Sequence, residues 1–139
     1  MINKVNKVPK FGDVYLVEFD GDGSVQTGSR PAVVFQNNVG NTYSPNVTVL
    51  PLTSKVKKTN MPTHVLLPSQ STGLRRDSMV LCENPVCIPK WKLGQFLTSL
   101  PVEYMGKIAE ANMYASAAIA YVNPEVLTSI RTRAIELNA

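Results

Sequence analysis

Residue types that often carry catalysis or bind metals are scarce in this chain. It has two cysteines, Cys82 and Cys87, and a single histidine, His64. The cysteine spacing can serve a zinc site, but no second cysteine pair completes the usual four ligands. A Cys/His nucleophilic pair is disfavoured as well, because Cys82 lies in an apolar segment, where a buried thiol is normally inert. The sequence therefore predicts no metal site, no cofactor and no disulfide framework.

Charged side chains are also few, and no apolar run is long. Charged residues make up 17% of the 139 residues and hydrophobic ones 44%, which indicates one globular domain. The longest apolar run, 114–122, is far shorter than the roughly 20 residues that span a bilayer. Residues 1–10 lack the hydrophobic core of a secretory signal. We expect a cytoplasmic protein with reduced thiols and no membrane contact, whose net charge of +4 favours polyanionic partners.

What the chain does contain is a series of short β-type runs separated by Gly, Pro and Asn. The runs lie at 14–19, 31–36, 47–54, 63–68 and 78–83. The polar loop between the second and third runs predicts a hairpin. Pro51 cannot donate a ladder hydrogen bond, so the third strand is expected to be bulged or at an edge. Five such strands predict a small, strongly bent antiparallel barrel or sandwich.

The C-terminal third of the sequence has helical periodicity. Apolar or small side chains recur at helical spacing after Pro101, which predicts a helix packed on the barrel. Asn123, Pro124 and Glu125 form a typical helix start, and a narrow apolar stripe follows that suits a docking face. This stripe consists of Leu127, Ile130, Ala134 and Leu137. We therefore divide the chain into residues 1–122, a barrel with its packed helix, and 123–139, an additional helix.

Basic residues gather in three loops of the predicted barrel. These clusters are Lys55, Lys57 and Lys58, then Arg75 and Arg76, then Lys90 and Lys92. Each cluster alone is more often a solvated face than a site. Loops distant in sequence converge at one end of a small barrel, however. Around an aromatic residue such as Tyr43, Phe19 or Trp91, they can bind single-stranded nucleic acid through phosphate contacts and base stacking.

Five ordered segments resemble a known family. They read FGDVYLVEF, GSRPAVVFQNNVGNTYSP, VLPLTSKVKK, MPTHVLLP and DSMVLCEN, and cover about residues 11–100, with the helix at 101–120 in its expected place. They are similar to the MazF/PemK type II toxins, which are metal-independent endoribonucleases. The resemblance implies a mainly β protein with α-helices: an SH3-like small antiparallel barrel that forms a homodimer. It also implies cleavage of single-stranded RNA (mRNA) at short sequences and neutralisation by a cognate antitoxin.

The family's catalytic Arg and Thr fall on Arg30 and Thr53, and a family carboxylate falls on Glu83, the best local candidate for general base. Without the resemblance, we would interpret Arg30 as a salt-bridge residue at a strand end and Thr53 as a β-forming residue on a half-buried surface. His64 would be a structural or surface residue. The RNA-binding residues implied by the family are Phe19, Gln26, Gly28, Ser54, Lys55, Ser78 and Asn84.

The chain departs from the family pattern at two positions. Val25 stands where the family has a Glu, and Val86 where it has a basic residue. One alternative is therefore a catalytically impaired module on the same barrel that binds RNA or protein. Another is a DNA gyrase poison, like the CcdB toxins, which share the fold. Retention of both Arg30 and Thr53 favours the nuclease, because a gyrase poison would not need that pair.

Overall fold

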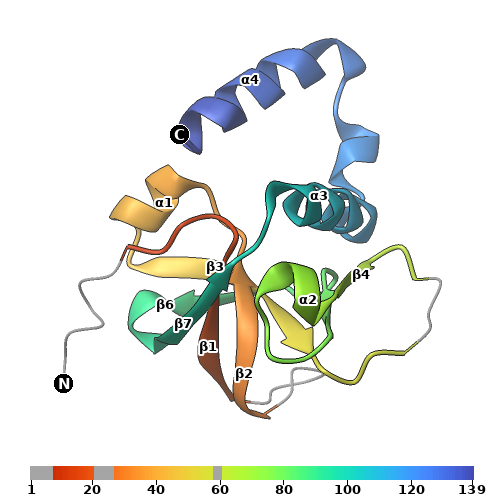
Figure 1. Ribbon diagram of the computed structural model, residues 1–139. Helices are drawn as coiled ribbons and strands as arrows, with labels where there is room; N and C mark the ends of the chain where they lie inside the picture. The colour runs from red at the N-terminus through yellow and green to blue at the C-terminus, as the bar shows by residue number, and fades with distance from the viewer. Residues whose placement is uncertain (1–7, 21–26, 58–60) are drawn as a thin grey trace.

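The computed structural model describes residues 8–20, 27–57 and 61–139 (Figure 1). These residues form one bent antiparallel sheet, in the strand order β4-β5-β3-β2-β1-β7, with β6 paired to β3. The strands are β1 (Asp13–Asp20), β2 (Thr27–Val34), β3 (Asn46–Thr53), β4 (His64–Leu67), β5 (Ser78–Leu81), β6 (Val86–Pro89) and β7 (Leu93–Ser99). The predicted class, mainly β with C-terminal helices, is confirmed.

Strand β3 holds the sheet together because it changes partners along its length. It pairs with β6 from Asn46 to Val49 and with β5 at Leu52 and Thr53, while β2 lies along its other side. Pro51 stands in the gap between these two partners, where an absent N–H interrupts neither ladder. The expectation of an edge strand is therefore wrong: β3 lies inside the sheet.

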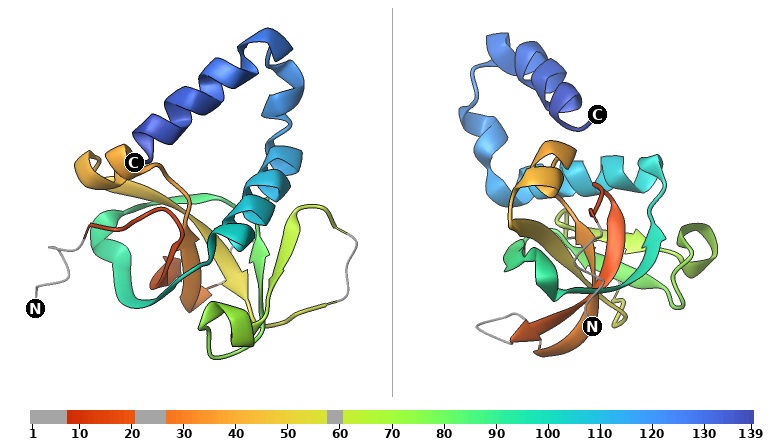
Figure 2. Two further views of the ribbon diagram at one scale, coloured as in Figure 1. Left: turned by 45° about the horizontal axis from the view of Figure 1, so that its top comes forward. Right: turned by 90° about the vertical axis from the view of Figure 1, so that its left-hand side faces the viewer.

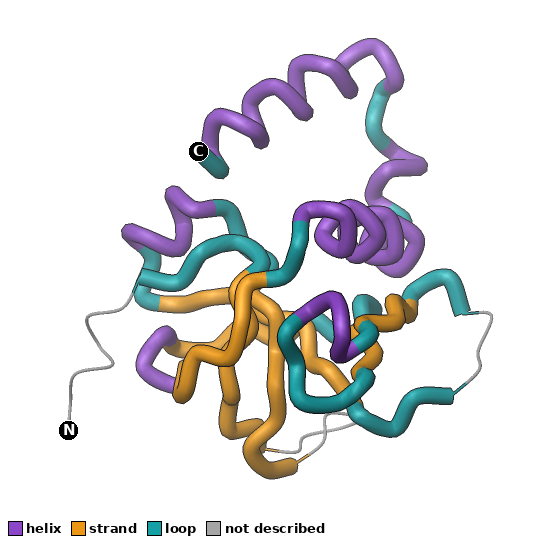
Figure 3. Tube along the Cα trace, in the orientation of Figure 1, coloured by secondary structure: helices purple, strands orange, loops and turns teal. Residues whose placement is uncertain are grey.

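Helices occupy most of the remaining chain, and α1, α3 and α4 lie on one side of the sheet (Figure 3). The helices are α1 (Asn38–Tyr43), α2 (Ser69–Thr72), α3 (Val102–Ser116) and α4 (Leu127–Leu137). The segment between β2 and β3 was expected to be a turn-rich loop, but it contains α1. The reason is a local cap, in which Asn37 Oδ1 accepts a hydrogen bond from the N–H of Gly40 at 2.9 Å.

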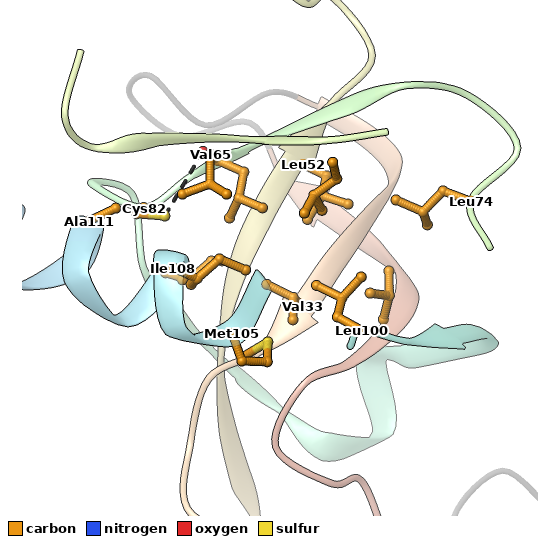
Figure 4. Packing of buried hydrophobic residues seen from close by; sticks show 13 residues of the cluster. Val33, Leu52, Val65, Leu74, Cys82, Leu100, Met105, Ile108 and Ala111 are labelled. Carbon is orange, nitrogen blue, oxygen red and sulfur yellow. Dashed lines mark hydrogen bonds between the residues drawn. The ribbon is translucent and has the colours of Figure 1, made fainter. Parts of the chain in front are cut away.

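Two buried clusters cover the two faces of the strands. Val14 and Val33 contribute to the first cluster, whereas their neighbours Tyr15 and Ala32 contribute to the second, as the two-residue period of a strand requires. Figure 4 shows Ile108 of α3 pointing into the first cluster, where it is fully buried. The prediction of a helix packed on the barrel is confirmed.

Helix α4 is attached to the rest of the protein mainly at its C-terminal end. None of its residues is buried, and it lies apart from the strands with its end beside α1 (Figure 2). Asn138 Oδ1 accepts from the backbone N–H of Asn38 and the Asn38 side-chain amide donates to the Asn138 carbonyl, both at 3.0 Å. The predicted cap is confirmed, but on a short 3-10 helix (Pro124–Val126) that leads into α4: Asn123 Oδ1 accepts from the N–H of Glu125 at 2.9 Å. No helix in the described part of the chain is long and apolar enough to cross a membrane.

The two thiols differ in their environments, and we expect them to react at different rates. Cys82 is fully buried, whereas Cys87 is exposed on β6. Burial, with a smaller contribution from the Glu83 carboxylate, raises the pKa of the Cys82 thiol to about 12, so it stays protonated at pH 8. Titration of the native protein with a thiol reagent should therefore detect one fast thiol, and denaturant should release the second. Two fast thiols in the native protein would contradict the burial of Cys82.

Candidate active site

The pairing of β2 with β3 brings Arg30 and Thr53 together. The two strands pair from Val34 and Val49 to Ala32 and Pro51. Continuing this register by two residues places Arg30 opposite Thr53, and side chains directly opposite in an antiparallel pair share one face. The β2–β3 pairing ends at Ala32 and Pro51, while β5 pairs with Leu52 and Thr53 on the other edge of β3. The two side chains therefore lie just beyond the end of the β2–β3 ladder.

A cavity of about 680 Å³ lies beside Arg30 and Thr53. Its described lining comes from five strands, β1, β2, β3, β5 and β7, from Ser54 just after β3, and from the loop that leads into β5. The lining residues are Leu16, Ser29, Arg30, Pro31, Leu52, Thr53, Ser54, Gly73, Leu74, Arg75, Arg76, Ser78, Gln95, Phe96 and Leu97. The structure thus places four of the residues implied by the resemblance on one cavity: Arg30, Thr53, Ser54 and Ser78.

The cavity is strongly cationic. Arg30, Arg75 and Arg76 line it, and none of its described lining residues is an Asp or Glu. The Nε of Arg30 is buried and has no hydrogen-bond partner among the described residues. Buried polar groups are normally paired, so such a donor in a cationic cavity is suited to an oxygen of a bound anion. Within residues 8–20, 27–57 and 61–139, no acidic side chain forms a salt bridge with Arg30.

Thr53 is held in place by its own backbone environment. Its side chain is buried, and Oγ1 accepts a hydrogen bond from the N–H of Lys55 at 3.1 Å. Because that bond uses a lone pair of the oxygen, the hydroxyl hydrogen remains able to donate. Ser78 Oγ, which also lines the cavity, donates to the carbonyl of Arg76 at 3.0 Å and so ties the arginine loop to β5.

The remaining residues implied by the resemblance do not line this cavity. Phe19 is 4% exposed and packs in the second cluster, so its ring is not available to a base in this structure. Gly28 adopts a φ of +96° in β2, a conformation that favours glycine. Lys55 is exposed beyond β3, and Asn84 lies in the turn after β5. Gln26, like Val25, lies outside the described residues.

Glu83 lies away from Arg30 and Thr53 within one protomer. Ser78, at the start of β5, lines the cavity, whereas Glu83 follows the opposite end of that strand. There its carboxylate Oε2 is 2.9 Å from Nε2 of His64, which begins β4. The cross-strand pair of His64 with Leu81 brings the two side chains together. A structural role for His64 agrees with this pairing.

Sequence reasoning did not include Gln95, Phe96 and Leu97 in the site. All three lie on β7, which was not among the predicted strands. Gly94 breaks the β pattern, and register shifts against β1 interrupt the strand's pairing, so the local periodicity is weak. Arg75 and Arg76 were singled out as a basic cluster, but nothing in the sequence placed them beside Arg30.

Comparison with known proteins defines the class of this domain. Residues 10–113 match the family described as PemK-like, MazF-like toxin of type II toxin-antitoxin system. The chain is 38% identical over 113 residues to Endoribonuclease EndoA of Bacillus subtilis (strain 168), covering 81% of this chain and 97% of the relative. This protein therefore belongs to the PemK-like, MazF-like toxin family.

Solved structures agree with that assignment. A mycobacterial endoribonuclease in complex with its cognate antitoxin is 26% identical with a TM-score of 0.67, over 78% of this chain and 95% of that one. MazF (Form-I) from Deinococcus radiodurans is 22% identical with a TM-score of 0.69, over 81% and 99% respectively, and supports the fold alone. The family match ends at residue 113, within α3, so α4 lies beyond it.

Proposed function

We propose that this protein is a cytoplasmic endoribonuclease that cuts single-stranded RNA at short sequences without a metal ion, and that it is the toxin of a type II toxin-antitoxin pair. One observation carries the proposal: Arg30, whose buried Nε has no hydrogen-bond partner among the described residues, lines the same cavity as Thr53, Arg75 and Arg76. The similarity to an enzyme named as an endoribonuclease supports it, as does the similarity to one solved with an antitoxin.

The proposed reaction uses the 2′-hydroxyl of the RNA as the nucleophile. Its oxygen gives up its proton to a general base and forms a bond to the adjacent phosphorus while the bond to the 5′-oxygen of the next nucleotide breaks. The leaving oxygen takes up a proton from solvent, which gives a 2′,3′-cyclic phosphate and a 5′-hydroxyl. Negative charge grows on the non-bridging oxygens during this step. The planar guanidinium of Arg30 can donate to two of them at once. Thr53 orients the attacking hydroxyl, since its own pKa makes it a poor unaided base.

The residues that line the cavity also argue against the two alternative functions, a catalytically impaired binding module and a gyrase poison. A module that had lost catalysis would have no reason to keep a buried, unpaired arginine donor, which costs free energy unless a ligand pairs with it. A gyrase poison has no need of the Arg30 and Thr53 pair. The cationic lining instead suits a polyanionic strand threaded past the two residues.

The proposed function can be tested by incubating purified protein with a long single-stranded RNA in excess EDTA. We expect discrete cuts, mapped by primer extension, whose fragments end in a cyclic phosphate and a 5′-hydroxyl. The cuts should disappear in Thr53→Ala protein of unchanged circular dichroism. RNA that stays intact with well-folded wild-type protein would overturn the proposal.

Glu83 remains the proposed general base, and its position sets a condition on that role. Within one protomer it lies at the end of β5 opposite the cavity, paired with His64. If it acts on the substrate, a second protomer must supply it, so the proposed homodimer would build each site from Arg30 of one chain and Glu83 of its partner. We propose this shared site as the arrangement that reconciles the two residues.

Mixed dimers test whether Arg30 and Glu83 of one site come from different protomers. Arg30→Ala and Glu83→Gln proteins should each be nearly inactive as homodimers. A heterodimer, isolated through two different affinity tags, would contain one site with both substitutions and one with neither. A shared site therefore predicts about half of the wild-type activity per dimer, whereas a site within one protomer predicts an inactive heterodimer. A fully active Glu83→Gln homodimer would remove the residue from the mechanism.

A further inference from the structure

We propose that Phe96 on β7 is the platform on which a nucleobase flanking the cut phosphate stacks, so that it helps to set which sequences are cleaved. This inference rests on the proposed function, because it assigns Phe96 a role in binding RNA in the cavity that holds Arg30 and Thr53. The position was not among the residues implied by the family resemblance.

The first support is location. Phe96 is the one aromatic side chain among the described residues that line the cavity holding Arg30 and Thr53. The residue is 39% exposed, so part of it is accessible to a ligand while the rest is packed. A single-stranded RNA whose phosphate meets Arg30 must place an adjacent base close by, and every base has a face that can stack on an aromatic ring.

The second support is the elimination of the other aromatic candidates. Phe19 is buried in the second cluster, while Tyr43 and Trp91 are exposed but do not line the cavity. Trp91 lies in the short 3-10 helix (Lys90–Lys92) between β6 and β7, where Lys92 Nζ is 5.7 Å from the centroid of its ring. The tertiary arrangement therefore selects Phe96 from the aromatic residues that precede α3.

The third support is that the ring is held in position. Phe96 pairs across the strands with Tyr15, and the two rings meet edge to face, with centroids 5.5 Å apart and planes at 72°. Because Tyr15 is itself buried, it holds the Phe96 ring in a fixed position. A ring braced on one side loses little freedom when a base stacks on it, and such pre-organisation favours binding.

Neighbouring groups complete a subsite suited to a nucleotide. Gln95, the preceding residue on β7, is exposed and also lines the cavity, and its side-chain amide can both donate and accept hydrogen bonds. Arg75 presents a cation from the loop before β5. In this subsite, a base would stack on Phe96, its edge would bond to the Gln95 amide, and a neighbouring phosphate would meet Arg75.

Substitution of Phe96 tests the inference. The probe is the RNA segment that the wild type cuts, with a 2′-O-methyl group at the cut to prevent cleavage. We expect Phe96→Ala to bind it roughly ten- to a hundredfold more weakly, as loss of a base–aromatic stack does. Phe96→Trp should restore binding, and Phe96→Leu, which keeps apolar bulk but has no ring, should not. On the cleavable RNA, KM should rise more than kcat falls, and primer extension should show a relaxed preference at one flanking nucleotide.

Matched controls separate the outcomes. Trp91→Ala removes a more exposed aromatic ring, 65% accessible, from outside the cavity and should leave binding and the cleavage pattern unchanged. If the wild type cuts RNA and Thr53→Ala does not, but Phe96→Ala binds and cuts normally, the stacking inference is wrong and the proposed function stands. If the wild type neither cuts nor binds RNA, both are wrong. Equal losses in the Leu and Trp variants would indicate a packing role and overturn the inference.

Discussion

Arg30→Ala protein is expected to cut RNA about a hundred- to a thousand-fold more slowly than the wild type, the usual cost of removing one transition-state donor. The guanidinium lines the cavity with a buried Nε that has no partner in the described part of the chain, so its loss deprives the developing phosphorane charge of a pre-positioned cation. Folding should not suffer. Arg30 forms no salt bridge within the described residues, and removing an unpaired buried donor relieves a cost.

Arg30→Lys distinguishes geometry from charge. Lysine keeps the positive charge but replaces the rigid fork of donors by a single ammonium group. We expect it to recover RNA binding but only a small part of kcat, because two oxygens can no longer be held in one plane. Single-turnover cleavage with enzyme in excess measures this directly, since it separates chemistry from product release.

Arg75→Ala is the matched control for that series. Arg75 is an exposed arginine on the same cavity, so its removal should raise KM and reduce the salt dependence of binding while kcat stays close to wild type. Equal losses of kcat in the Arg30 and Arg75 variants would mean that the cavity acts only through its overall charge. Wild-type cleavage by Arg30→Ala protein would refute the assignment of the site.

Ile108→Ala should destabilise the protein by about 2–5 kcal/mol, the range for removing a large aliphatic side chain from a packed core. Ile108 is 0% exposed and points from α3 into the first cluster, among residues of several strands (Figure 4). Its truncation removes apolar contact and leaves a cavity that the rigid sheet cannot fill. The effect should appear as a lower denaturation midpoint in urea, followed by far-ultraviolet circular dichroism.

Ile130→Ala is the same substitution on α4 and should change the free energy of unfolding by no more than about 0.5 kcal/mol. Ile130 is 50% exposed, and no residue of its helix is buried. The pair of variants therefore tests the division of the chain into a barrel with α3 and an additional helix. A loss at Ile130 as large as that at Ile108 would show that α4 docks its apolar stripe in solution.

Much of the fold followed from local patterns. The five predicted strands correspond to β1 through β5, because β-branched residues and turn residues alternate clearly in that part of the chain. The spacing of Met105 and Ile108 located α3, and the Asn123 cap marked the start of the last helical segment. Strands β6 and β7 were missed because they are short or interrupted and depend on long-range pairing with β3 and β1.

The sequence by itself determined the family and the helix that closes the first cluster, and it singled out Arg30 and Thr53 as the candidate pair, because these depend on residue identity at fixed spacing. Tertiary structure alone decided which residues share the cavity. The β2–β3 ladder ends at Ala32 and Pro51, just before Arg30 and Thr53, and the bent sheet brings Phe96 of β7 to the same cavity. The tertiary structure also places the Glu83 carboxylate against His64, away from Arg30 and Thr53. Such proximity arises from strand register over long sequence separations, which no local pattern encodes.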